Sequence, residues 1–350
     1  MSFLTTINGV RKSVMRRMTR NIGTSHFEHT IDLTSTIEIK RILISRPNHR
    51  LGNLLLITPL LQEVSETLPE CKIDLFVKGS VAPILFKNYP NVDRIIQLPK
   101  KPLKDLMKYV GGWMRIKRNR YDIVINVVNN SSSGRLSTKF ANSKYKFFGE
   151  INEEIQMRYT DHEHIAKYPV YSFRNFLNKL GFPKNEKQVS PLNLKLSPDE
   201  LAEGKKSLQD IVKNDKKTIA LFTYATGAKR YSESWWEEFY ERVKKEFPDY
   251  NVIEVLPVEN VSQIAFKAPS FYSKDVRQIG SLIANTDVFI GADSGMMHLA
   301  SASLAATVAL FKVTSTNTYR PYGNKSTAID TTTGNLDDWM KVIRGILTKE

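Results

Sequence analysis

Short apolar runs alternate with longer segments of helical periodicity along most of the chain. Runs rich in Val, Ile, Leu and Phe are typical of buried strands, whereas apolar residues at three- and four-residue spacing predict helices. The predicted strands cover 41–44, 72–77, 92–98, 121–127, 145–149, 218–222, 251–256, 288–290 and 307–311. The predicted helices cover 54–68, 80–87, 103–118, 164–180, 197–212, 234–247, 276–284 and 336–347, with one more beginning at Met296.

This alternation predicts an α/β fold with parallel sheets covered by helices. The second half of the chain repeats the order of the first, which predicts two similar domains with a cleft between them. We place the boundary in the polar stretch 183–190 and assign 36–185 and 186–350 to the two domains. Ligands of such sheets bind beyond the carboxyl ends of the strands. The loops 49–53 and 129–133 should therefore lie on the binding edge.

Residues 1–35 differ from the rest. Apolar residues at helical spacing alternate with basic ones, which include Arg11, Lys12, Arg16, Arg17 and Arg20. This leader is either a basic amphipathic helix on an anionic membrane surface, or a helix packed on the protein or frayed from it. The pattern leaves both alternatives open.

The net charge of +15, from 51 basic and 36 acidic residues, favours polyanionic partners. No nucleic-acid-binding motif is present, so we expect no nucleic-acid partner. The single cysteine, Cys71, excludes an intrachain disulfide and fits a reducing, cytoplasmic compartment. No apolar run approaches the ~20 residues that a membrane-spanning helix needs.

The densest group of candidate chemistry lies at 286–300. A short apolar strand ends at Gly291, and a small-residue turn leads into the helix beginning at Met296. Asp293 or Ser294 can cap this helix, and Gly295 lets the backbone approach a ligand closely. Unpaired N–H groups and the helix dipole make such a turn a phosphate site. The alternative is an ordinary capped turn.

Three segments resemble one known family in order. They are RILI at 41–44 with LGNLLLITPLL at 51–61, then Lys229-Arg230-Tyr231 with Trp235 or Trp236, and GADSGMMHLASA at 291–302. They resemble glycosyltransferase family 9, the bacterial heptosyltransferases of lipopolysaccharide core assembly. The resemblance covers roughly residues 40–345 and implies the GT-B fold, two Rossmann-like domains with parallel sheets facing a central cleft. It also implies inverting transfer of a sugar from a nucleotide diphosphate.

The resemblance places the donor in the C-terminal domain. Two phosphates need fixed positive charge and N–H donors. Lys229 supplies a point charge, while Thr226, rather than Thr223, supplies a hydroxyl. Ser294 and the N–H groups of Gly295, Met296 and Met297 complete the cradle. His298 either contacts phosphate, holds Asp293 or is a helix-interior histidine, and Glu259 resembles the residue that holds the nucleotide ribose.

Asp293 is an acidic group beside a diphosphate, and its role stays open. It can accept hydrogen bonds from sugar hydroxyls, coordinate a magnesium ion or cap the helix. We therefore expect no cofactor, with magnesium as the one exception left open. The cluster Asp161-His162-Glu163-His164 lacks the spacing of a standard zinc site, so we expect no metal there.

One position departs from the family pattern. An inverting transferase needs a base for the acceptor hydroxyl, and where the family has an aspartate this chain has Asn53. A neutral amide is not a useful base. Three alternatives follow: His49 acts as the base, Asn53 only orients the acceptor, or the protein binds donor without turnover. Asn53 is also a candidate helix N-cap.

These observations predict transfer of a heptose-like sugar from an ADP-heptose-like donor to a lipopolysaccharide core or related anionic glycolipid. The N-terminal domain would hold the acceptor, and the protein would be cytoplasmic with peripheral contact to the inner membrane. The alternatives are a catalytically silent nucleotide-sugar-binding protein and another nucleotide-sugar enzyme, such as an epimerase.

Overall fold

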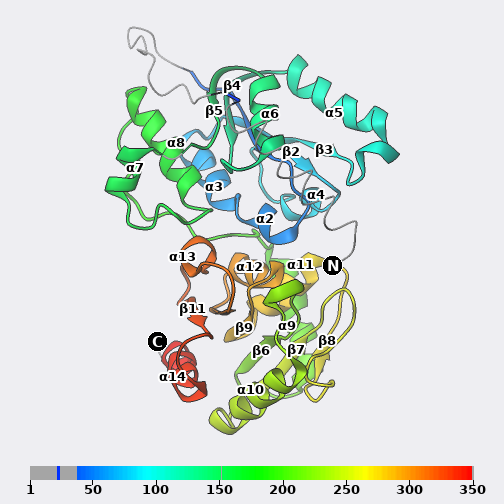
Figure 1. Ribbon diagram of the computed structural model, residues 1–350. Helices are drawn as coiled ribbons and strands as arrows, with labels where there is room; N and C mark the ends of the chain where they lie inside the picture. The colour runs from blue at the N-terminus through cyan, green and yellow to red at the C-terminus, as the bar shows by residue number, and fades with distance from the viewer. Residues whose placement is uncertain (1–21, 24–37, 151, 349–350) are drawn as a thin grey trace. The chain divides into compact units, whose positions relative to one another are not determined.

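The computed structural model describes residues 22–23, 38–150 and 152–348, and the leader predicted at 1–35 lies almost wholly outside these ranges. The chain divides into two compact units, each built on one sheet (Figure 1). The first unit comprises the described residues up to His49, Leu60–Pro83 and Tyr89–Val189. The second comprises Arg50–Pro59, Ile84–Asn88 and the chain from Ser190 onward.

The first sheet has five parallel strands in the order β3-β2-β1-β4-β5. The order steps outward on both sides of β1, so that β1 is central and almost wholly buried, as its apolar sequence predicts. The strands are β1 Arg41–Arg46, β2 Lys72–Lys78, β3 Val92–Leu98, β4 Arg120–Asn126 and β5 Asn142–Phe147.

Helices α2 to α8 alternate with these strands in sequence. Their bounds are α2 Leu51–Leu55, α3 Thr58–Thr67, α4 Ala82–Leu85, η1 Pro102–Lys104, α5 Leu106–Arg118, α6 Ser132–Phe140, α7 Glu153–Arg158 and α8 Tyr168–Lys179. Neither α6 nor α7 was predicted from the sequence. Both have polar sequences and begin at the side-chain caps Ser131 and Asn152.

The helix predicted at 54–68 is two helices, α2 and α3. Pro59 has no backbone N–H and its ring clashes with the preceding turn, so a continuous helix through it is costly. The chain instead makes a turn at Leu56 and Ile57, and the Thr58 hydroxyl donates to the Leu55 carbonyl at 2.7 Å. The prediction that Asn53 is an N-cap was wrong, because α2 begins at Leu51 and Asn53 is its third residue.

The second sheet has six parallel strands in the order β11-β10-β9-β6-β7-β8. The strands are β6 Thr218–Phe222, β7 Asn251–Val255, β8 Ser270–Phe271, β9 Val288–Ala292, β10 Thr307–Phe311 and β11 Thr327–Asp330. The helices are α9 Pro198–Val212, η2 Gly227–Lys229, α10 Glu233–Glu246, α11 Val276–Ala284, α12 Gly295–Ala302, α13 Thr316–Tyr319 and α14 Leu336–Thr348. Two parallel sheets with flanking helices confirm the predicted α/β fold of two Rossmann-like units.

The second unit has a large aromatic core beneath its sheet. Trp236 and Phe239 of α10 are fully buried, and Trp339 of α14 packs 5.8 Å from Trp235, measured between ring centroids. Each buried aromatic side chain removes a large apolar area from water, so these helices are held mainly by the hydrophobic effect.

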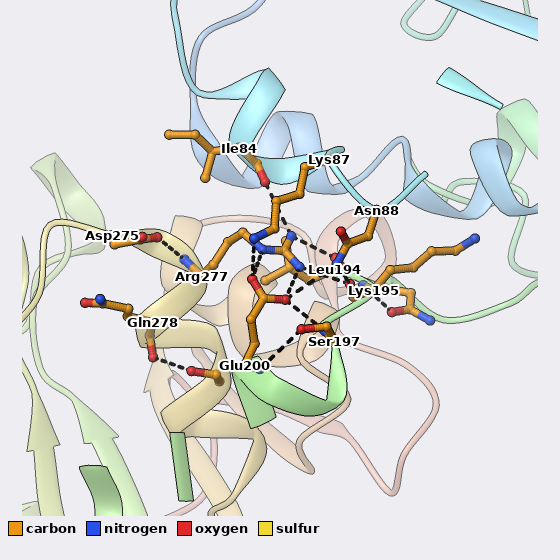
Figure 2. Close-up of polar contacts among 12 residues, drawn as sticks. Ile84, Lys87, Asn88, Leu194, Lys195, Ser197, Glu200, Asp275, Arg277 and Gln278 are labelled. Atoms are coloured by element: carbon orange, nitrogen blue, oxygen red, sulfur yellow. Dashed lines mark hydrogen bonds and ion pairs between the residues drawn. The ribbon is translucent and has the colours of Figure 1, made fainter. Parts of the chain in front are cut away.

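A partly buried ion pair joins α9, α11 and two connecting segments within the second unit (Figure 2). Arg277 donates to both carboxylate oxygens of Glu200 at 2.6 and 2.7 Å and to the carbonyl oxygens of Leu194 and Lys195. Glu200 also completes a capping box with Ser197. Arg277 holds the pKa of Glu200 far below its ordinary value, because it stabilises the ionised carboxylate.

Candidate functional site

The predicted phosphate turn lies where β9 ends and α12 begins, at the carboxyl edge of the second sheet. The Ser294 hydroxyl accepts from the backbone N–H of Met297 at 3.4 Å, so Ser294 is the helix cap. Gly295 and Met296 form the first turn and are partly exposed. Asp293 does not cap the helix, which leaves its carboxylate for other partners.

Asp293 and Lys229 form the charged centre of this edge. The Lys229 ammonium lies 2.5 Å from an oxygen of Asp293, whose side chain is only 5% exposed. The same oxygen accepts from the Thr314 hydroxyl. Lys229 also lies 5.8 Å from the centre of the Tyr319 ring. A lysine, a carboxylate, a hydroxyl and an aromatic ring therefore converge from η2, the turn after β9 and the segment after β10.

Two glycines allow a close approach to α12 within the second unit. A Cβ atom on Gly52 of α2 would lie 2.6 Å from the His298 ring and 3.3 Å from the Gly295 Cα. A Cβ atom on Gly295 would lie 3.4 Å from the Gly52 backbone nitrogen. His298 is 6% exposed in the second turn of α12. Glycine is therefore required sterically at position 52, where α2 packs on the start of α12, whereas a Cβ atom on Gly295 would make an ordinary contact.

The two threonines after β6 lie in different environments. Thr223 is buried and donates to Glu254 at 2.5 Å, while it accepts from the Gln263 N–H at 3.1 Å. Burial raises the pKa of the Glu254 carboxyl. Thr226 is exposed at the N-terminus of η2. Thr226 is thus the hydroxyl that a ligand can reach.

Glu259 lies in an exposed turn after β7. The turn is closed by the Asn260 N–H, which donates to the Pro257 carbonyl at 2.8 Å. Asn260 has a φ of 53°, a left-handed conformation that asparagine tolerates. The carboxylate is therefore accessible at the end of a strand that neighbours β6 in the sheet.

The two predicted catalytic residues fall in different units. His49 is exposed in the loop after β1, in the first unit. Asn53 is partly buried in α2, which belongs to the second unit. In the other predicted loop, Asn129 accepts from the buried Arg135 at 2.8 Å, so this loop is tied to α6.

The acidic and histidine cluster at 161–164 has a structural explanation. Asp161 accepts from Lys167 at 2.6 Å and from the Tyr171 hydroxyl at 2.7 Å. Over residues 22–23, 38–150 and 152–348, no group of three or more His, Cys, Asp or Glu side chains is arranged to hold a metal ion. None of the helices in the same ranges is long and apolar enough to cross a membrane.

No role was predicted from the sequence for Thr314 or Tyr319, although Thr314 continues the family resemblance in order. Both residues follow β10, and their position after a strand at the carboxyl edge is a further signal that could have indicated a role. Lys312, also after β10, donates to the Arg230 carbonyl at 2.6 Å and lies 4.7 Å from the Tyr231 ring centre. This edge therefore has more positive charge than Lys229 alone provides.

The geometry fits a site for a substrate with a diphosphate group. It combines a helix N-terminus, a fixed ammonium group and exposed hydroxyls at the carboxyl edge of a parallel sheet. Together with the two Rossmann-like units, this is the arrangement expected of a glycosyltransferase of the GT-B fold.

Comparisons with known proteins agree with this class. Residues 273–342 match the model of glycosyltransferase family 9 (heptosyltransferase). Lipopolysaccharide heptosyltransferase 3 of Escherichia coli is 24% identical over 78% of this chain and 84% of its own length. Lipopolysaccharide heptosyltransferase 1 of Campylobacter coli is 23% identical over 75% of this chain and 82% of its own length. The chain is therefore similar to glycosyltransferase family 9 in its C-terminal part and to heptosyltransferases over most of its length.

Solved structures show the same fold. The glycosyl transferase family 9 protein of Veillonella parvula has a TM-score of 0.66 and 16% identity, with 91% of this chain and 92% of that chain covered. Escherichia coli heptosyltransferase WaaC with ADP has a TM-score of 0.61 and 16% identity, with 87% of this chain and 99% of that chain covered. At these identities the similarity establishes the fold alone.

Proposed function

We propose that this protein transfers a heptose-type sugar from ADP-heptose, or a closely similar nucleotide diphosphate donor, to a lipopolysaccharide core or related anionic glycolipid. The names of the relatives support this proposal, because the curated relatives are lipopolysaccharide heptosyltransferases and one solved relative is heptosyltransferase WaaC with ADP. The second unit would hold the donor and the first unit the acceptor, with inversion at the transferred carbon. The net charge of +15 suits a phosphorylated acceptor.

The observation that carries the proposal is the pairing of Lys229 with Asp293 at the start of α12. Negative charge grows on the diphosphate as the sugar leaves, and fixed positive charge at that position stabilises the transition state. The Lys229 ammonium and the N–H groups of Gly295 and Met296 would face the departing diphosphate. The exposed Thr226 hydroxyl would add a further donor, and Glu259 would accept from the ribose hydroxyls.

Asp293 has two roles in this proposal. Its negative charge fixes the position of the ammonium group before the donor binds, and its second oxygen would accept from a sugar hydroxyl. Because Lys229 already supplies a cation to Asp293, we propose that transfer needs no magnesium ion. Addition of EDTA should then leave the rate unchanged.

The proton of the acceptor hydroxyl must be removed during transfer. Asn53 cannot remove it, because an amide has no useful basicity at neutral pH. We propose His49 as the base, since it is exposed in the loop after β1 and an ordinary histidine titrates near neutrality. Asn53 would orient the acceptor by hydrogen bonds.

The test is donor turnover by the purified protein with ADP-heptose and lipopolysaccharide core acceptors, alongside donor binding by calorimetry. His49→Ala should bind donor normally and lose at least a hundredfold in kcat, while Asn53→Ala should mainly raise the KM for the acceptor. Normal turnover by His49→Ala would exclude His49 as the base. If the wild-type protein binds donor but transfers nothing to any acceptor, it is a silent nucleotide-sugar-binding protein, as Asn53 allows.

A further inference from the structure

The first unit has a continuous stripe of exposed apolar side chains on η1 and α5. Leu103 is 94% exposed, Met107 89% and Leu106 59%, and Val110 and Met114 are also exposed. Their three- and four-residue spacing places the α5 members on one face of the helix. Single exposed apolar residues are common on soluble proteins, but a contiguous stripe indicates an interaction surface.

The opposite face of α5 packs on the sheet, and this packing keeps the apolar stripe exposed to solvent. Ile116 is fully buried, and a Cβ atom on Gly112 would lie 2.7 Å from Leu98, so α5 packs tightly on the sheet. Trp113 packs edge-on against Phe76, with ring centroids 5.3 Å apart. The helix cannot rotate to bury the stripe without losing these contacts. Figure 1 shows α5 at the periphery of the first unit.

Basic residues border the stripe. Residues 100–120 contain eight Lys and Arg residues and one acidic residue, Asp105. That carboxylate caps α5 by accepting from the Lys108 N–H at 3.1 Å. An apolar stripe bordered by lysine and arginine is the pattern of a helix that lies in the interface of an anionic membrane.

A second group of cations lies beside the same face. The Lys117 ammonium is 5.4 Å from the ring centre of the partly exposed Phe140. Lys146 donates to the Lys139 carbonyl at 2.8 Å. Burial, with Lys117 and Lys139 nearby, lowers the pKa of Lys146. Cations this close repel one another, so anionic groups at this surface would stabilise them.

The surface also has a recess. A cavity of about 250 Å³ lies between α5 and β3, lined in part by Ile95, Met107, Gly111 and Arg115. No atom lies within 4 Å of the position of a Cβ atom on Gly111. The recess therefore combines apolar walls with a guanidinium group, which suits an acyl chain below a phosphate headgroup.

We propose that the α5 surface, made of Leu103, Leu106, Met107, Val110, Met114 and the bordering Lys and Arg residues, docks the protein on an anionic lipid membrane. The apolar stripe would enter the headgroup region while the cations contact lipid phosphates. Its biological purpose rests on the proposed function, since a membrane-bound enzyme meets a glycolipid acceptor at high local concentration. Membrane binding itself needs neither donor nor acceptor.

The test is co-sedimentation of the full chain with vesicles of equal parts phosphatidylglycerol and phosphatidylcholine, or of phosphatidylcholine alone. The wild-type protein should bind only the anionic vesicles, and less tightly at about 0.5 M salt than at about 0.05 M. Leu106→Asp/Met107→Asp should weaken binding at least tenfold. Lys104→Glu/Lys108→Glu should weaken it by about 25-fold or more, since each basic residue near the surface contributes a factor of about five.

Matched controls come from the same chain. Met157 lies on a helix and is 83% exposed, so Met157→Asp tests the effect of an aspartate at any exposed helical position. Lys205→Glu/Lys206→Glu makes the same change of charge on the exposed face of α9. Both control variants should bind anionic vesicles within twofold of wild type.

Several outcomes would overturn the proposal. These are unchanged vesicle binding by both α5 variants, equal loss in the controls, or an effect of the α5 variants on oligomeric mass instead of on vesicle binding. The last would indicate a protein interface. Sugar transfer to a lipid-free core oligosaccharide should be the same in the α5 variants and wild type. Vesicle binding without any transfer would reject the proposed function while leaving the membrane surface supported.

Discussion

The Lys229 ammonium lies 2.5 Å from the Asp293 carboxylate, although 64 positions separate the two residues in the sequence. Asp293 is 4% exposed, and its backbone N–H donates to the Leu310 carbonyl at 3.0 Å. The carboxylate is therefore fixed by the sheet, and it fixes the lysine in turn. A positioned ammonium stabilises developing charge at less reorganisation cost than a mobile one.

Removing the ammonium group should separate its structural and functional roles. Lys229→Ala should lower kcat/KM by about 10²- to 10³-fold, since one positioned charge is worth that much in a transition state. It should also lower the free energy of unfolding by about 1–3 kcal/mol, because the buried Asp293 carboxylate keeps the Thr314 hydroxyl but loses its cation. The double variant Lys229→Ala/Asp293→Asn should regain stability and stay inactive. Recovery of activity in the double variant would contradict a role for Lys229 at the diphosphate.

The Thr314 hydroxyl should matter through Asp293. Thr314→Val keeps the shape of the side chain but removes the donor to Asp293, so Lys229 loses part of its positioning. We expect kcat/KM to fall about tenfold, with Thr314→Ser close to wild type. Thr318→Val, in the neighbouring α13, is the control and should change steady-state kinetics by less than twofold. Equal effects of Thr314→Ser and Thr314→Val would show that loss of the hydroxyl does not cause the fall in kcat/KM.

The close approach of α2 to α12 can be tested with one methyl group. In Gly52→Ala the new Cβ atom would lie 2.6 Å from the His298 ring, so α2 or the ring must move. Overpacking of this kind typically costs about 1–3 kcal/mol, and we expect a matching fall in donor affinity measured by calorimetry. Gly345→Ala in α14 meets no atom within 4 Å and should be neutral or slightly stabilising. Equal stability and equal donor affinity of Gly52→Ala and Gly345→Ala would show that a side chain at position 52 does not clash with α12.

The ion pair of Arg277 with Glu200 predicts a dependence of stability on pH. The pKa of Glu200 is lowered in the folded state, so its stabilising contribution is present above the ordinary value of 4.5 and is lost as pH falls below it. Glu200→Gln should lower the free energy of unfolding at pH 7 by about 2–4 kcal/mol. At pH 3 this difference should shrink by about 2 kcal/mol. Only the wild-type protein has a carboxylate at this position, so only the wild-type protein loses the stabilisation that comes from its lowered pKa.

Urea unfolding followed by tryptophan fluorescence measures this difference, since Trp235, Trp236 and Trp339 lie in the second unit. Glu203→Gln, on an exposed position of α9, is the matched control and should differ from wild type by less than about 0.5 kcal/mol at both pH values. A constant effect of Glu200→Gln from pH 3 to pH 7 would show that charge is not involved.

The sequence determined the parts of the protein that depend on neighbours along the chain. Apolar runs identified β1, β6 and β10 because buried parallel strands need such runs. The helices at 198–212 and 276–284 were evident from their period and caps. The turn at 291–296 was evident as a capped strand-to-helix turn, since capping is a local interaction. Local rules failed at Pro59, which divides one predicted helix into two, and at α6 and α7.

Tertiary structure decided what the local signals left open. Asp293 was compatible with a cap, a metal ligand or a sugar contact until the fold brought Lys229 and Thr314 to it from η2 and from the segment after β10. The need for glycine at position 52 became clear only from the packing of α2 on α12. The exposure of the apolar stripe on α5 depended on which helix face the sheet buries. Each of these depends on contacts between residues distant in sequence, and such contacts leave no periodic pattern to recognise.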